Sequence, residues 1–193
     1  MDKAASRSAL ECLSRANVAL ERMGNSETLE DIESGWSDFL TAAHRIYSKL
    51  EQGAKVTEVS KHWFEKKKYQ RKTDPFLRYI HHARNVDEHG LTRVTEKTAG
   101  GLALGVGPGA WRFDGTLGPG GTMKITALGG QVPGVSKFVK VIPSKVRLQD
   151  VVDRGVKYEP PKGVEGQELT PIEVVKSALV MLQELVEQAE SLH

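Results

Sequence analysis

The residues best suited to chemistry lie near the middle of the 193-residue chain, where Arg84 is followed directly by Asn85 and then, four positions later, by His89. Histidine as a residue type exchanges protons near neutral pH. The arginine fork binds phosphate oxygens in pairs and can stabilise the charge of a transition state. Cleavage of a phosphodiester by a neighbouring hydroxyl needs these groups: a base, an acid for the leaving oxygen, and a cation. We therefore expect His89 to act as general acid or base, Arg84 to hold the phosphate, and Asn85 to orient His89 or bond the phosphate.

The spacing of this group has a geometric consequence. Arg84 and His89 are five residues apart, which is about 140° around a helix, so one helix presents them in different directions. Two such helices facing each other could bring them together. The alternative is structural, with Arg84 pairing with Glu88 one turn further on and His89 capping the end of the helix.

Basic residues are concentrated just before and within the same region. The whole chain has a net charge of +2, but residues 61–84 hold eight Lys and Arg against two acidic residues. Such a segment forms either a solvated face or a surface that neutralises phosphates. Because its cations cannot all share one side of a helix, we expect part of the segment to be a loop or a helix end before Asp74. The candidate RNA-binding residues are Lys66, Lys67, Lys68, Arg71, Lys72 and Arg78.

Two other kinds of site are not favoured by the sequence. The glycine-rich stretches at 105–109 and 118–122 lack the Lys-Ser/Thr pair of a phosphate-binding loop, and hairpin turns explain them better. His81 and His89 are eight residues apart, about 12 Å along a helix, too far to share one metal ion. The lone Cys12 excludes a disulfide within the chain and a multi-cysteine zinc site. We expect neither a metal nor a cofactor.

Apolar spacing and capping residues predict helices on both sides of a glycine-rich region. Residues 1–91 predict four helices, and a capping box at Thr170–Glu173 opens a fifth. The first helix is expected to end at Gly24-Asn25, and the second to run from about Ser26 to Gly53. The third is expected to begin near Thr57, and the fourth to run from its cap Asp74 to Gly90. The expected core positions include Leu10, Leu13, Ala16 and Leu20; Leu29, Trp36 and Leu50; Val59 and Trp63; Phe76, Tyr79 and Val86; and Val175, Leu179 and Leu182.

The region between the fourth and fifth helices is rich in short β-prone runs. They lie around residues 102–106, 110–113, 122–128, 136–142, 145–148 and 156–158, separated by turn residues. We interpret residues 92–169 as an antiparallel meander. The expected fold class is therefore α+β: an up-and-down helical bundle made of residues 1–91 and 170–193, with a β-rich meander inserted before the C-terminal helix.

A long helical hairpin, a basic segment and a helix with Arg84, Asn85 and His89 together resemble the HEPN superfamily (higher eukaryotes and prokaryotes nucleotide-binding). The resemblance covers about residues 1–91 and 170–193. It implies a metal-independent endoribonuclease, a homodimer whose two motif helices line one RNA-cleaving cleft, and products with a 2′,3′-cyclic phosphate and a 5′-hydroxyl. A toxin–antitoxin or defence role, with a regulatory partner protein, is a further implication. Leu91 stands where some toxin members have a tyrosine.

The remaining expectations concern location and an alternative function. No stretch approaches the roughly 20 apolar residues of a membrane span, and the N-terminal residues lack the apolar segment of a secretory signal. We expect a cytoplasmic protein that binds RNA, forms a homodimer and does not enter a membrane. The alternative is a HEPN-like module that binds nucleotide, RNA or protein without cleaving.

Overall fold

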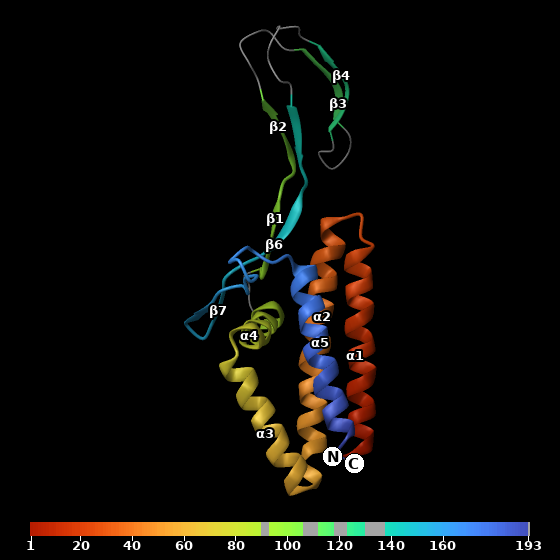
Figure 1. Cartoon of the computed structure of the whole chain (residues 1–193), viewed down its shortest axis with the longest axis vertical. Coiled ribbons are helices and arrows are strands. Elements are labelled where there is room, and N and C mark those ends of the chain that lie inside the picture. The colour runs from red at the N-terminus through yellow and green to blue at the C-terminus, as the bar shows by residue number, and fades with distance from the viewer. Residues whose placement is uncertain (90–92, 106–111, 118–122, 130–137, 193) are drawn as a thin grey trace. The chain divides into compact units, whose positions relative to one another are not determined.

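The computed structural model describes residues 1–89, 93–105, 112–117, 123–129 and 138–192; within these ranges, the side chains of His89 and of residues 101–142 lie outside the description. The chain divides into two compact units (Figure 1). The first is formed by Met1–Thr98 and Lys145–His193 and contains the α-helices of the described residues. The second is Ala99–Ser144 and is built from strands.

Three long helices pack together in the first unit. Helix α1 (Lys3–Gly24) and helix α2 (Leu29–Gly53) form an antiparallel hairpin, and α5 (Pro171–Glu190) packs against both (Figure 1). The Thr170 capping box at the start of α5 has both of its hydrogen bonds. The three helices bury a continuous apolar core that includes Ala9, Ala16, Trp36, Phe39, Leu40, Ile46, Leu50, Val175, Leu182 and Val186.

Helices α3 (Glu58–Thr73) and α4 (Pro75–His89) follow the short 3-10 turn η1 (Ala54–Val56). Asp74 separates α3 from α4 and caps the second of them, because its side chain accepts a hydrogen bond of 3.0 Å from the Leu77 amide. Pro75 then occupies the first turn, where its missing N–H costs nothing. The side chains that α4 buries are Leu77, Tyr79, Ile80, Ala83 and Val86.

Two short antiparallel strand pairs belong to the helical unit. Strand β1 (Thr95–Thr98) pairs with β6 (Lys145–Leu148), which contacts α2 and α5. Strand β7 (Val151–Asp153) pairs with β8 (Val156–Tyr158), and both contact α4. The β7–β8 turn consists of Arg154 and Gly155, with φ of 52° and 79°, as a two-residue hairpin turn with positive φ at both positions requires.

The second unit contains two further antiparallel pairs. Strand β2 (Gly101–Gly105) pairs with β5 (Phe138–Ile142), and β3 (Arg112–Leu117) pairs with β4 (Met123–Gly129). The β3–β4 register shifts between Asp114 and Gly115, which is the signature of a β-bulge.

The α+β class and the packed helices are confirmed, but the meander is wrong. A meander pairs each strand with the next one along the chain, whereas β1 pairs with β6 and β2 with β5, enclosing β3–β4. β1 and β2 therefore pair with strands much later in the chain, and short-range sequence patterns cannot reveal such pairing. Strands β1 and β7 were not predicted.

Some core positions of the helices also differ from the prediction. Val59 was assigned to the core but is 70% exposed, and Phe64 is buried in α3 instead; Leu10 of α1 is also exposed. The loop or helix end expected before Asp74 is a helix end, because α3 stops at Thr73 with Arg71 and Lys72 in its last turn. None of the helices in the described residues is both long and apolar enough to cross a membrane.

Candidate functional site

Helix α4 presents polar residues on two faces. Arg78, His82, Asn85 and His89 follow one another at intervals of four, three and four residues, so their Cα atoms lie along one stripe of the helix. We call this stripe, with β7 and β8, the hairpin face. Arg84 lies elsewhere on the helix and lines a pocket together with His81.

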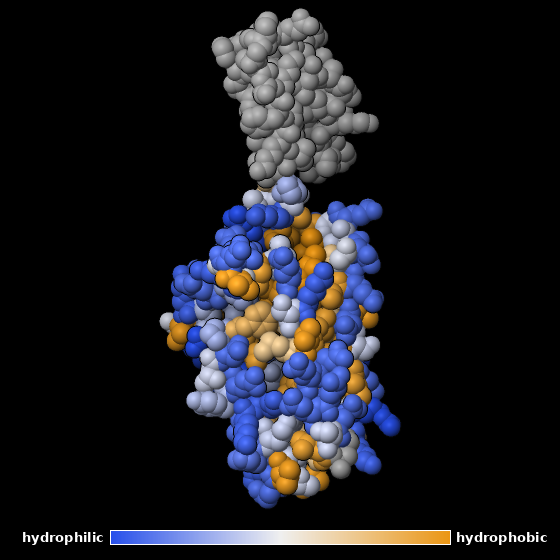
Figure 2. Space-filling model, in the orientation of Figure 1, coloured by the Kyte–Doolittle hydropathy of each residue, from blue (hydrophilic) through white to orange (hydrophobic). Residues whose placement is uncertain are grey.

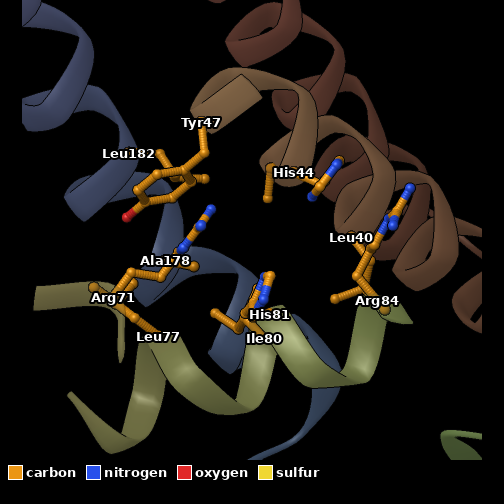
Figure 3. Close-up of a pocket in the computed structure, with 11 residues that line it drawn as sticks. Leu40, His44, Tyr47, Arg71, Leu77, Ile80, His81, Arg84, Ala178 and Leu182 are labelled. Carbon is orange, nitrogen blue, oxygen red and sulfur yellow. The ribbon is translucent and has the colours of Figure 1, made fainter. Parts of the chain in front are cut away.

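The pocket is a narrow crevice between α2, α3, α4 and α5, with a cavity volume of about 20 Å³ inside an empty space of about 360 Å³ that includes its open mouth. Apolar side chains are visible between α4 and α5 in the space-filling view (Figure 2). Figure 3 shows Arg71 and Arg84 reaching toward the space between α2 and α4, with His44 and His81 between them in this view. The lining residues are Leu40, Ala43, His44, Tyr47, Arg71, Leu77, Ile80, His81, Arg84, Ala178 and Leu182, of which none is acidic.

The polar atoms of this pocket are incompletely paired. The Nε atoms of Arg71 and Arg84 and the Nδ1 atom of His44 are buried without a hydrogen-bond partner in the described residues. The Arg71 guanidinium lies over the Tyr47 ring at 4.4 Å from its centroid, which is a cation–π contact. Buried donors without partners are costly, and an anion would satisfy them.

Burial and the two arginines keep the pocket histidines neutral. Burial lowers the pKa of His81 to about 4, and the charges of Arg71 and the neighbouring histidines act in the same direction. The pKa of His44 is lowered by burial, then by Arg84 and Arg71. Burial raises the pKa of Tyr47 to about 12, so its phenol stays protonated at neutral pH. The two arginines are therefore the pocket's cations near neutrality.

Arg84 also makes the contact that the structural alternative requires. It forms an ion pair with Glu88 one turn further along α4, and its side chain is only 17% exposed. His89 is the last residue of α4, and its side chain is among those outside the description. Arg84 therefore faces the pocket, while the Cα of His89 lies on the hairpin face.

The hairpin face contains a hydrogen-bonded group that joins α4 to β7. Nδ1 of His82 lies 2.7 Å from Oδ2 of Asp153, and Nδ2 of Asn85 donates to the same oxygen at 2.9 Å. The Asn85 and His82 hydrogen bonds lower the pKa of Asp153, so its carboxylate is ionised at neutral pH. The His82 ring stacks on Tyr158 of β8 with centroids 3.8 Å apart. Asn85, expected to orient His89, in fact bonds to Asp153.

The basic segment does not act as one surface. Lys66, Lys72 and Arg78 are exposed, whereas Lys67 is half-buried. Lys68 forms an ion pair of 2.9 Å with Glu51 of α2, and Arg71 lines the pocket. The structure thus places Arg71 and Arg84 in the lining of one pocket and leaves the other candidates distributed along α3 and the start of α4.

Sequence reasoning missed His44 and Tyr47 in the pocket and Asp153 and Tyr158 on the hairpin face. Asp153 is 71 residues from its partner His82, so no spacing rule connects them. The sequence offered one signal for two separate polar sites, the adjacent pair His81 and His82. Neighbouring residues on a helix point in different directions, so the two histidines must face different surroundings.

Comparisons with protein-family models, curated proteins and solved structures found no match. Among the described side chains, no three His, Cys, Asp or Glu residues lie together as a metal site would require.

Proposed function

We propose that the protein is a HEPN-type, metal-independent endoribonuclease that cleaves RNA by attack of a 2′-hydroxyl on the adjacent phosphate. The observation that supports this proposal is the convergence of Arg71 and Arg84, from two helices, on a pocket with two neutral histidines and no acidic lining residue. Guanidinium groups bind phosphate oxygens in pairs, and a phosphate would compete with Glu88 for Arg84. Both arginines were candidates from the sequence.

In this proposal each residue of the motif has a defined role. Arg84 stabilises the negative charge that builds up on the phosphate, and His89 transfers a proton. Because Arg84 and His89 lie on different faces of α4, we propose a homodimer in which Arg84 of one copy and His89 of the other serve the same phosphate. Arg71 and the cations Lys66, Lys67, Lys68, Lys72 and Arg78 would hold the flanking RNA. We further propose a cytoplasmic location and a regulatory partner protein.

The activity can be tested with purified protein and a mixed RNA pool in EDTA. We expect cleavage that leaves 5′-hydroxyl ends, which polynucleotide kinase labels without prior phosphatase treatment. Arg84→Ala and His89→Ala should each reduce the rate by about 10²–10⁴-fold, the usual contribution of a charge-stabilising or proton-transferring group. The exposed His62 of α3 provides the control His62→Ala, which should cleave normally. Activity that survives either of the first two substitutions would remove that residue from its role.

The composite site has its own test, because two inactive variants should complement each other. After subunit exchange, half of the dimers pair Arg84→Ala with His89→Ala, and one of their two sites is intact. The mixture should therefore recover about a quarter of the wild-type activity. Mixing without recovery, in dimers shown to exchange, would place Arg84 and His89 of the same copy in each site.

A non-catalytic binding module is the second candidate, and the Arg84–Glu88 ion pair favours it because Arg84 already has an anionic partner. This candidate requires RNA binding without turnover, with an affinity that His89→Ala leaves unchanged.

A further inference from the structure

The His82–Asp153 pair on the hairpin face has the geometry of a proton-transfer unit. Asp153 is ionised and has no proton to donate, so the hydrogen in the 2.7 Å contact belongs to Nδ1 of His82. When the ring is neutral, this tautomer has its lone pair on Nε2, which is the atom that a general base uses. Nε2 makes no hydrogen bond to a described residue, and the His82 side chain is 21% exposed.

Three further contacts fix the imidazole in place. Asn85 holds the Asp153 oxygen from the same helix, the Tyr158 ring covers one face of the His82 ring, and His81 meets its edge. The Asp153 side chain is only 14% exposed, so water weakens its interaction with His82 little. Such support keeps a base in the productive tautomer and orientation.

The surroundings of the pair are cationic. The Arg78 guanidinium lies over the Tyr158 ring, 5.6 Å from the ring centroid. Arg154, next to Asp153 at the hairpin turn, is 91% exposed and has a positive φ of 52°. This conformation favours Asn or Gly, so an arginine there costs stability. Two exposed guanidinium groups beside a base fit a phosphodiester substrate.

We propose that His82, positioned by Asp153, is the general base that takes the proton from the attacking 2′-hydroxyl of RNA; this proposal rests on the ribonuclease function proposed above. The 2′-O–H bond breaks and its proton moves to Nε2, while the 2′-oxygen forms a bond to phosphorus. The bond from phosphorus to the 5′-oxygen breaks, and that oxygen takes a proton from His89. The products are a 2′,3′-cyclic phosphate and a 5′-hydroxyl, and the two histidines exchange protonation states.

The placement of His89 agrees with this division of roles. It lies seven residues after His82, which is within about 20° of the same helix direction and about 10 Å along the axis. The His82–Asp153 hydrogen bond would also hold β7 against α4 without any part in catalysis, so the experiment must separate these two roles.

The experiment compares two substrates in the full-length protein: a short RNA, and a ribonucleoside 3′-(para-nitrophenyl phosphate). Because para-nitrophenolate leaves without a proton, the second substrate needs a base but no acid. We expect His82→Ala to lower kcat by about 10²–10⁴-fold on both substrates, and His89→Ala to lower it on RNA only. Asp153→Asn should lower kcat by about 10–100-fold with little change in KM, as expected for a positioning residue. Added imidazole should restore part of the activity of His82→Ala.

A second variant guards against loss of folding, since His82→Ala removes the contacts with Asp153 and Tyr158. In His82→Gln the side-chain amide can still donate to Asp153 but cannot take a proton, so this variant should be folded and inactive. His62→Ala is the matched control on an exposed helical surface. Circular dichroism and the thermal midpoint report folding for each protein.

The outcomes distinguish the two proposals. If the wild type cleaves neither substrate, the ribonuclease function and the role of His82 both fail. If the wild type cleaves and His82→Gln retains its kcat, only the role of His82 is overturned. If the loss is confined to RNA, His82 is an acid and not the base, which also overturns the proposal. Loss on both substrates with imidazole rescue supports it.

Discussion

At the scale of single residues, burial decides which groups of the pocket are charged. His81 lies beside Arg71 and His44, and its pKa is lowered to about 4, chiefly by burial. A neutral imidazole can accept a hydrogen bond without adding positive charge to the pocket. Burial, with the charge of Arg71 acting in the same direction, therefore leaves His81 as a neutral side chain of the pocket at neutral pH.

The low pKa of His81 predicts how folding stability depends on pH. The folded protein keeps His81 neutral down to about pH 4, whereas the unfolded chain takes up this proton near pH 6.5. Between these values the unfolded state binds more protons, so stability should fall as the pH is lowered. Urea unfolding at several pH values in this window should show a flatter dependence for His81→Gln than for the wild type. His44 retains its own contribution in both proteins.

The exposed His62 of α3 again provides the control. His62→Gln should follow the wild-type curve. Equal slopes for the wild type and His81→Gln would show that His81 is not held neutral in the folded protein.

At the scale of the elements, one close contact between α1 and α2 depends on Gly35. A Cβ atom built there would overlap Met23 Cγ and lie 3.2 Å from the Ala19 carbonyl oxygen. Met23 is almost fully buried and Ala19 contributes backbone, so neither can move freely. Gly35→Ala should therefore destabilise the protein by about 1–3 kcal/mol, as overpacking of a core usually does.

Gly24 at the end of α1 is the matched control, because a Cβ added there meets nothing within 4 Å. Gly24→Ala should leave the free energy of unfolding within about 1 kcal/mol of the wild type or increase it. Chemical denaturation of the two variants measures both effects. Equal stabilities would mean that the helices separate at Gly35 at little cost.

The elements also show which parts of the structure the sequence could predict. The caps at Asp74 and at Thr170 act within three residues, so the starts of α4 and α5 were predicted correctly. The pairing of β1 with β6 joins residues about fifty positions apart, and no local pattern specifies it. Arg84 and Asn85 were recognised by their spacing from His89. What each side chain contacts, however, depends on α2 and β7, which only tertiary packing brings to α4.

At the scale of the whole molecule, the two compact units differ in what they contribute. The residues of the pocket and of the hairpin face all belong to the helical unit, Met1–Thr98 with Lys145–His193. Residues 1–91 and 170–193, on which the proposed function rests, also lie in this unit. The second unit therefore supplies no residue of the proposed chemistry, and its contribution can be tested by removing it.

The β1–β6 ladder offers a clean place to remove the second unit, because Thr98 and Lys145 are paired at its end. Antiparallel partners can be joined by a two-residue turn, for which Asn-Gly is favoured. A chain with Ala99–Ser144 replaced by Asn-Gly should keep its helical circular dichroism signal and unfold in one cooperative thermal transition. It should also cleave RNA with a kcat close to that of the full chain. Loss of the helical signal would show that the helical unit needs the strands in order to fold, whereas a folded protein with a raised KM would assign RNA binding to the second unit.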